Sequence, residues 1–105
     1  MRTVLSAFII TVLITLLSSC VPYEVVEIAR LSSDGFIWME TDSGHYNKIG
    51  ILVGDCSQYS ARISDWADTM GIPWEMKSEP GHVYTQVYVD DRWYRLEYGV
   101  PPIVQ

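Results

Sequence analysis

An apolar run near the N-terminus limits how much of this chain can form a folded domain. Residues 4–17 are almost entirely apolar, Arg2 precedes them, and small residues lead from them to Cys20. A basic residue, an apolar stretch of this length and small residues before a cleavage point are typical of an export signal. The run is short for a membrane-spanning helix, which needs about 20 apolar residues. We therefore predict a signal peptide over residues 1–19 and a domain built from the rest of the chain.

The tetrapeptide Leu17-Ser18-Ser19-Cys20 resembles the lipobox of bacterial lipoproteins. The resemblance implies cleavage before Cys20, lipidation of Cys20, and a lipoprotein tethered to a bacterial membrane on its extracytoplasmic side. Acyl chains anchor a protein by burying methylene groups, at about 0.8 kcal/mol each. An uncleaved membrane anchor is the alternative interpretation, and it also places the remaining chain outside the cytoplasm.

The charge balance excludes one class of partner. Without residues 1–19 the chain keeps six basic and thirteen acidic residues, a net charge of −7, and it has no basic run. Nucleic-acid binding depends on clustered Lys and Arg, so we expect no nucleic-acid partner. The 86 residues from Cys20 onward are enough for one small domain, close to the lower limit for a self-sufficient core.

The cysteine count bears on the chemistry. If Cys20 carries lipid, Cys56 has no disulfide partner although the compartment permits disulfides. If Cys20 is not processed, a Cys20–Cys56 disulfide is the alternative. An unpaired thiol in an exported protein is either buried and inert or kept for its reactivity.

The segment that follows the predicted signal peptide has few sequence features that indicate secondary structure or function. We assign residues 20–45 to the lipidated Cys, a tether and short strands, and residues 46–105 to the core domain. Within the first segment, residues 21–31 indicate a tether followed by a short strand. Residues 32–35 indicate a turn, and residues 36–40 a short strand.

A helix is predicted over residues 56–70. Apolar side chains recur there at spacings of three and four, the period of a helix with one buried face. Asp55 is suited to the N-cap, and Gly71 to the position after the last turn. Cys56 then lies in the first turn, where the helix dipole favours a thiolate and the charge of Asp55 opposes it.

A β-hairpin is predicted after a strand at residues 74–77. Residues 82–89 are rich in Val, Tyr and Thr, and a second β-prone run over residues 92–98 follows after Asp90-Asp91. A two-residue loop places Val89 opposite Arg92.

The same register places Tyr84 opposite Glu97 and makes Glu97 a diagonal neighbour of His82. Side chains 82, 84, 95 and 97 then share one face of the sheet, and diagonal pairs stand about 7 Å apart. If the helix packs across that face, Cys56, His82 and Glu97 form a triad. In such a triad a thiol attacks a carbonyl carbon, a histidine moves the proton and a carboxylate orients the imidazole.

Several short motifs resemble, in order, the transglutaminase-like superfamily of papain-related folds. They are Gly54-Asp55-Cys56, Gly71-Ile72-Pro73, Gly81-His82, Tyr88-Val89-Asp90, Arg92-Trp93 and Leu96-Glu97. The resemblance covers residues 54–98. It implies an α+β fold in which the Cys-bearing helix packs on a small antiparallel sheet. It also implies a cofactor-free Cys56–His82–Glu97 triad acting on peptide or protein amides, by hydrolysis or acyl transfer.

This sequence departs from the family pattern at three points. Glu97 stands in place of the usual Asp and is one methylene longer, and Asp91 replaces the usual turn glycine. The segment before Cys56 is short, so a protein partner that completes the substrate cleft is one expectation. A catalytically inactive binding module of the same fold, tethered at the membrane, is the alternative function.

The remaining candidates concern the oxyanion and metals. The Cys56 backbone N–H is a candidate oxyanion donor, and weaker orienting candidates are Asp55, Tyr46 and Asn47. His45 is a rival base. A zinc site from Cys56, His45 and His82 is not expected, because no paired-ligand spacing is present.

Overall fold

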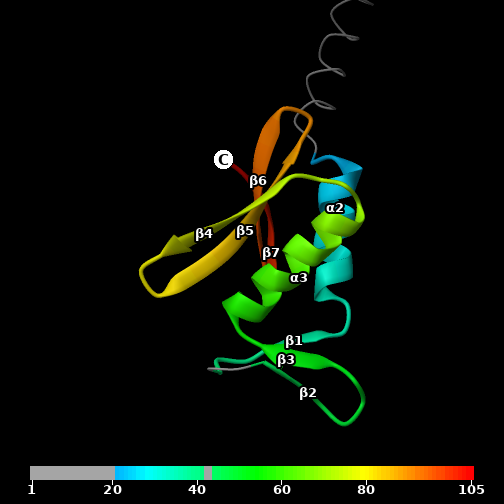
Figure 1. The fold of residues 1–105 in the computed structure, drawn as a ribbon, viewed down its shortest axis with the longest axis vertical. Helices are drawn as coiled ribbons and strands as arrows, with labels where there is room; N and C mark the ends of the chain where they lie inside the picture. Colours follow the sequence, from blue (N-terminus) through cyan, green and yellow to red (C-terminus); the bar gives the residue numbers. More distant parts are fainter. Residues whose placement is uncertain (1–20, 42–43) are drawn as a thin grey trace, which may run out of the picture.

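The computed structural model describes residues 21–41 and 44–105, which form an α+β fold (Figure 1). The described elements, in chain order, are α2 (Tyr23–Ser33), β1 (Phe36–Trp38), β2 (His45–Tyr46), β3 (Leu52–Gly54), α3 (Cys56–Thr69), β4 (Trp74–Glu79), β5 (His82–Val89), β6 (Arg92–Glu97) and β7 (Val100–Val104). The predicted class, an α+β fold with the Cys-bearing helix on a small antiparallel sheet, is confirmed. Neither of the two described helices is long and apolar enough to cross a membrane. The predicted signal peptide and Cys20 lie outside the described residues.

The strands form two sheets on either side of the start of α3. Strands β4, β5, β6 and β7 make an antiparallel meander in that order. In the small sheet β3 lies centrally, parallel to β1 and antiparallel to β2. Figure 1 shows the small sheet at the N-terminal end of α3, and α3 crossing the larger sheet. The first turn of α3 therefore lies where the two sheets approach each other.

Helix α3 begins and ends where its sequence predicts. The Asp55 carboxylate accepts a hydrogen bond from the Ser57 backbone N–H (2.9 Å), and the Gln58 side chain accepts one from the Asp55 N–H (2.9 Å). This reciprocal capping satisfies donors that a helix N-terminus leaves free. At the other end Gly71 adopts a positive φ of 69° and ends the helix. Cys56 is thereby fixed as the first residue of α3.

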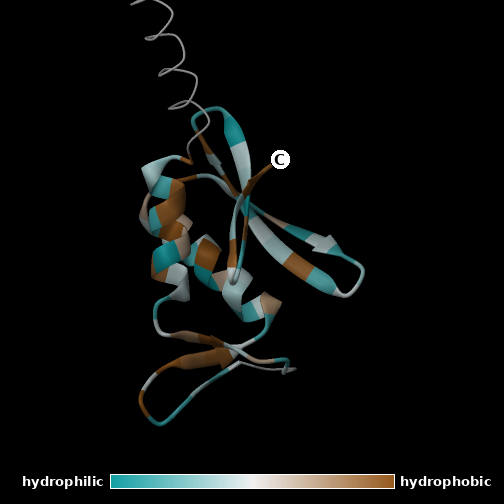
Figure 2. Ribbon diagram, turned by 180° about the vertical axis from the view of Figure 1, so that it is seen from behind, coloured by the Kyte–Doolittle hydropathy of each residue, from teal (hydrophilic) through white to brown (hydrophobic). Residues whose placement is uncertain are grey.

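The prediction of a tether and strand over residues 21–31 is wrong, because this segment is helix α2. Its buried side chains Val25, Ile28 and Ser32 recur at spacings of three and four and pack toward α3. The β-branched pair Val25-Val26 favours a strand locally, but burial of this face against α3 outweighs that preference. Figure 2 shows hydrophobic and hydrophilic stretches alternating along both helices, as expected for helices with one buried face.

The hydrophobic core joins the segment before residue 46 to the predicted core domain at residues 46–105. It contains residues of α2, β1, α3, β5 and β6, namely Val25, Ile28, Phe36, Tyr59, Ile63, Ala67, Val87, Tyr94 and Leu96. Arg62 of α3 donates to the carbonyl oxygens of Ser32 (2.8 Å) and Asp34 (2.5 Å) at the C-terminal end of α2. Residues 21–41 are thus packed into the same globule as the predicted core domain.

The β5–β6 hairpin has the predicted register. Val89 lies opposite Arg92, and Gln86 opposite Arg95. Asp90 and Asp91 have φ angles of 52° and 63°. Two successive left-handed residues define the tight turn whose twist matches a β-hairpin.

The two edge strands of the larger sheet differ in sequence. Edge strand β4 carries Glu75, Lys77 and Glu79 on one face. Edge strand β7, which the sequence did not predict, contains Pro101 and Pro102. A register irregularity between β6 and β7 falls at Arg95–Glu97, next to the predicted site.

Candidate active site

Cys56 lies in a tightly built helix start. It is a free, half-buried thiol that follows β3 directly. Gly54 permits this connection, because a Cβ atom added there would lie 2.6 Å from the Gln58 Cβ. Gln58 in turn holds the N-cap through Asp55. The thiol position is therefore set by three neighbouring residues rather than by a loose loop.

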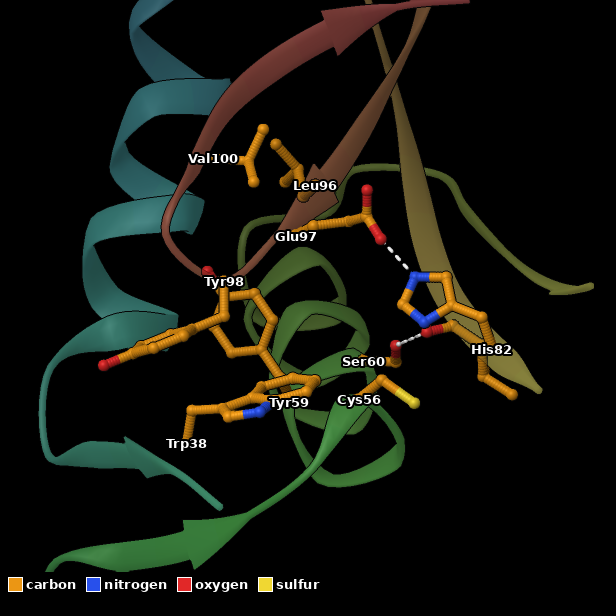
Figure 3. Close-up of a pocket in the computed structure, with 10 residues that line it drawn as sticks. Trp38, Cys56, Tyr59, Ser60, His82, Leu96, Glu97, Tyr98 and Val100 are labelled. Atoms are coloured by element: carbon orange, nitrogen blue, oxygen red, sulfur yellow. Dashed lines mark hydrogen bonds and ion pairs between the residues drawn. The ribbon is translucent and has the colours of Figure 1, made fainter. Parts of the chain in front are cut away.

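His82 and Glu97 form a charge-assisted hydrogen bond between β5 and β6. The Nε2 atom of His82 contacts Oε1 of Glu97 (Figure 3). Their side chains are 31% and 21% exposed, so the pair is partly shielded from water. Because Nε2 faces the carboxylate, Nδ1 is the ring nitrogen left for other chemistry. Figure 3 shows Nδ1 on the side of the ring nearer to Cys56.

The four side chains predicted to share one sheet face do contact one another. The rings of His82 and Tyr84 stack with centroids 6.2 Å apart, and the Arg95 guanidinium lies 3.7 Å from the Tyr84 ring centroid. Arg95 Nε donates to Glu97 Oε2 (3.0 Å), and its Nη1 pairs with Glu79 (3.2 Å). Arg95 Nη2 also donates to Glu97 Oε1 (3.4 Å), so Arg95 contacts both carboxylate oxygens and shares Oε1 with His82.

The electrostatic balance at Glu97 favours the carboxylate. Burial raises the pKa of Glu97, but hydrogen bonds and charge from Arg95 and His82 together outweigh burial. The net effect lowers the pKa below its ordinary value of 4.5. Glu97 is thus ionised throughout the neutral range and can act as an acceptor for an imidazole N–H.

The expectation that α3 packs across the face of His82 and Glu97 is wrong. The core residues of β5 and β6 that meet α3 are Val87, Tyr94 and Leu96. Strand side chains alternate between faces, so His82 and Glu97 belong to the opposite face. They meet the first turn of α3 at the end of the sheet, where His82 begins β5 and Glu97 ends β6.

Ser60 links the helix to the sheet beside this point. Its hydroxyl donates to the Val83 carbonyl oxygen (3.2 Å), and its own carbonyl accepts from the Thr85 hydroxyl (3.0 Å). Ser60 lies one turn after Cys56, and Val83 follows His82. These two hydrogen bonds therefore fix the position of the thiol relative to the imidazole. The spacing of four residues between Cys56 and Ser60 was a sequence signal for this role.

Two adjoining cavities meet at Cys56 and His82. A smaller one of about 190 Å³ also borders Glu97, and its remaining lining is largely aromatic and aliphatic: Trp38, Tyr59, Ser60, Val83, Leu96, Tyr98 and Val100. A larger, more open one of about 670 Å³ is lined by Trp38, Glu40, Thr41, Asp55, Cys56, Gly81 and His82. Figure 3 shows the thiol, the imidazole and the carboxylate around the smaller cavity. The predicted triad residues thus share one cleft.

Trp38 is a site residue that the sequence reasoning missed. It lines both cavities and stacks on Tyr98, with ring centroids 6.0 Å apart and an interplanar angle of 14°. It reaches the cleft because β1 pairs with β3, which leads directly into Cys56. A three-residue strand pairing of this kind has no local signal beyond its short apolar run.

The other candidates lie elsewhere or have structural roles. Asp55 borders the larger cavity but its carboxylate caps α3. Asn47 Oδ1 accepts from the backbone N–H groups of Ile49 and Ile51 (both 3.0 Å) and so supports a turn. Tyr46 is exposed and lines a separate depression beside Arg62. Neither Tyr46 nor Asn47 borders the two cavities at Cys56.

His45 lies on β2, exposed and paired with Val53. It borders neither of the two cavities at Cys56. Within residues 21–41 and 44–105, no group of three His, Cys, Asp or Glu side chains is arranged to hold a metal ion.

Comparison of the chain with protein-family models, with curated proteins and with solved structures gave no match. The resemblance to the transglutaminase-like superfamily therefore stays a prediction that rests on the sequence motifs of residues 54–98.

Proposed function

We propose that this protein is a thiol enzyme that acts on peptide or protein amide bonds through Cys56, His82 and Glu97. One observation carries the proposal. The Cys56 thiol, at a helix N-terminus, shares a cleft with an imidazole whose Nε2 is already held by a carboxylate. This is the arrangement that nucleophilic cysteine catalysis requires.

In the proposed reaction, His82 Nδ1 takes the proton of the Cys56 thiol as the sulfur attacks the amide carbonyl carbon. The tetrahedral intermediate collapses, the C–N bond breaks, and the imidazolium returns the proton to the departing amine. A thioester remains on Cys56. Water or a second amine then attacks this thioester and releases the thiol. Throughout, Glu97 holds the Nε2–H tautomer and stabilises the imidazolium.

The reactivity of the thiol tests this proposal without a known substrate. We expect wild-type Cys56 to be alkylated by iodoacetamide at substantial rates well below pH 8, and His82→Ala to lose that low-pH reactivity. The matched control is His45→Ala, since His45 borders neither cavity at Cys56. A thiol that is inert, or equally reactive in His82→Ala, would refute the catalytic proposal.

A membrane-tethered binding module without activity is the second candidate. The observation in its favour is that Arg95 shares the Glu97 carboxylate with His82 and lowers its basicity. The alkylation profile separates the two candidates, because a binding module has no need of a His82-dependent thiol. A protein partner is part of both proposals, whereas a peptide or protein substrate belongs only to the enzyme.

We further propose that the domain is tethered outside the cytoplasm through lipid on Cys20. The support is the Leu17-Ser18-Ser19-Cys20 motif after the apolar run. Cells expressing the full chain should incorporate radioactive palmitate into it, and Cys20→Ser should abolish incorporation. Label that persists in Cys20→Ser would refute the lipoprotein assignment.

A further inference from the structure

The smaller cavity beside Cys56 has the form of a side-chain pocket. We call its apolar walls, Trp38, Tyr59, Leu96, Tyr98 and Val100, the aromatic pocket. The Tyr98 ring lies edge-on to Tyr59, with centroids 5.5 Å apart, and is stacked on Trp38. The contacts among these three rings hold them against one another along the pocket. Cys56, His82 and Glu97 also line the pocket.

Two hydroxyl groups among the residues that line the pocket are engaged in hydrogen bonds to other parts of the fold. The Ser60 hydroxyl donates to the Val83 carbonyl oxygen (3.2 Å). The Tyr59 hydroxyl is hydrogen-bonded to the Ser33 hydroxyl (3.0 Å), so it is directed toward α2. A group that enters the pocket between Trp38, Leu96 and Val100 therefore meets more carbon surface than polar surface. Apolar side chains gain free energy in such a site, whereas polar ones lose their hydration.

The volume of the pocket sets the size of its occupant. A dry apolar cavity of about 150 Å³ is sufficient for a benzene molecule. The aromatic pocket, at about 190 Å³, accommodates a phenyl ring or a branched aliphatic side chain. The adjoining larger cavity, which shares Trp38, Cys56 and His82 with the pocket, leaves room for the rest of a peptide chain.

We infer that the substrates of this site are amides flanked by an aromatic or large aliphatic residue, whose side chain fills the aromatic pocket. This inference rests on the proposed function. The pocket thus determines specificity, while Cys56 and His82 supply the chemistry.

Three N-acetyl dipeptidyl chloromethyl ketones, with the sequences Gly-Gly, Gly-Phe and Phe-Gly, test this inference on the full chain. In each case the Cys56 thiolate displaces chloride and forms a thioether, which mass spectrometry locates and times. Iodoacetamide, which carries no side chain, measures the reactivity of the thiol itself. We expect one Phe-bearing reagent to alkylate Cys56 at least about tenfold faster than Gly-Gly. Equal rates for all three reagents would overturn the inference.

A matched pair of variants on β7 localises the effect. Val100 lines the pocket and is 45% exposed, whereas Val104 on the same strand is 50% exposed and does not line it. Val100→Phe should fill the pocket and abolish the Phe advantage, and Val104→Phe should retain it. Tyr98→Ala, which removes one wall, provides a second variant and should reduce the same advantage. A Phe advantage that survives in both Val100→Phe and Tyr98→Ala would also overturn the inference.

The iodoacetamide control separates this inference from the proposed function. Failure of the proposed function appears as an iodoacetamide rate that does not depend on His82. Failure of the pocket inference appears as a His82-dependent rate without any preference for Phe.

Discussion

The hydroxyl of Ser60 donates a hydrogen bond to the carbonyl oxygen of Val83, and this contact joins α3 to β5 beside the cleft. Cys56 lies one helical turn before Ser60, and His82 immediately precedes Val83. Cys56 and His82 are far apart along the chain, and this hydrogen bond and its neighbour from the Thr85 hydroxyl join the helix turn after Cys56 to the strand that begins with His82.

Ser60→Ala should therefore weaken both stability and thiol reactivity. Ser60 is 2% exposed, and loss of one such hydrogen bond costs about 1 kcal/mol. We expect a lower free energy of unfolding in urea and slower iodoacetamide alkylation of Cys56 at pH 7. Ser64→Ala is the control, because the Ser64 hydroxyl donates to carbonyl oxygens of its own helix, at Ser60 and Ala61. Equal effects of the two substitutions on alkylation would contradict this account.

Glu97→Gln should reduce the low-pH reactivity of Cys56. The amide cannot stabilise a His82 imidazolium by charge, and hydrogen bonds to charged groups contribute about 1.5–3 kcal/mol. We expect the iodoacetamide rate at pH 6 to fall by roughly tenfold or more. The control is Glu79→Gln, which removes a carboxylate that pairs with Arg95 and lies opposite His82 on the neighbouring strand without a hydrogen bond to its imidazole. A Glu97→Gln rate that matches the Glu79→Gln rate would show that Glu97 does not act through His82.

The stability of the protein should fall in acid partly through Glu97. Burial raises the pKa of Glu97, but the opposing effect of Arg95 and His82 is larger, so the net pKa is lowered. The folded state therefore binds a proton less readily than the unfolded state. The resulting stabilisation is present above pH 4.5 and is lost as the pH falls below 4.5 through the folded pKa.

Arg95→Gln should remove part of this pH dependence. We expect the difference in unfolding free energy between pH 6 and pH 3.5, measured in urea, to shrink by about 1 kcal/mol. Arg92→Gln on the same strand is the control and should leave the difference unchanged. An unaltered pH dependence in Arg95→Gln would mean that Arg95 does not set the ionisation of Glu97.

Asp91→Gly should stabilise the hairpin. Asp91 has a φ of 63°, a conformation that glycine adopts without cost and that other residues adopt at a cost. We expect the free energy of unfolding to rise by about 0.5–1 kcal/mol. The Tyr88 hydroxyl contact to Asp91, at 3.4 Å, is too long to offset this gain.

Asp34→Gly provides the comparison for the turn, since it removes the same charge at a residue with a φ of −67°. It should lower stability, because glycine increases the conformational freedom of the unfolded chain. If both substitutions shift stability in the same direction, loss of charge rather than backbone geometry would explain the result.

Local signals were sufficient to predict α3 and the β5–β6 hairpin. Asp55 and Gly71 cap the helix, and the Asp90-Asp91 turn sets the strand register that brings His82 to Glu97. These features depend on residues close together in the chain, so the sequence expresses them directly.

The features that the sequence did not predict depend on tertiary packing. Helix α2 carries the β-branched pair Val25-Val26, and only its contact with α3 makes the helix favourable. Trp38 reaches the cleft through the pairing of β1 with β3, a contact with no local signature. The apolar face of β5, with Val87 and Val89, is the face that packs on the core. His82 lies on the other face and meets α3 only because it begins the strand, a placement that strand alternation does not predict.

The two edges of the larger sheet restrict how the protein meets other chains. Strand β4 presents Glu75, Lys77 and Glu79 along its length, and β7 lacks two backbone N–H donors at Pro101 and Pro102. Sheets grow by adding strands to uncharged edges that have an unbroken row of donors. Neither edge of the larger sheet is therefore suited to pairing with a strand of another copy, so this sheet ends at β4 and β7.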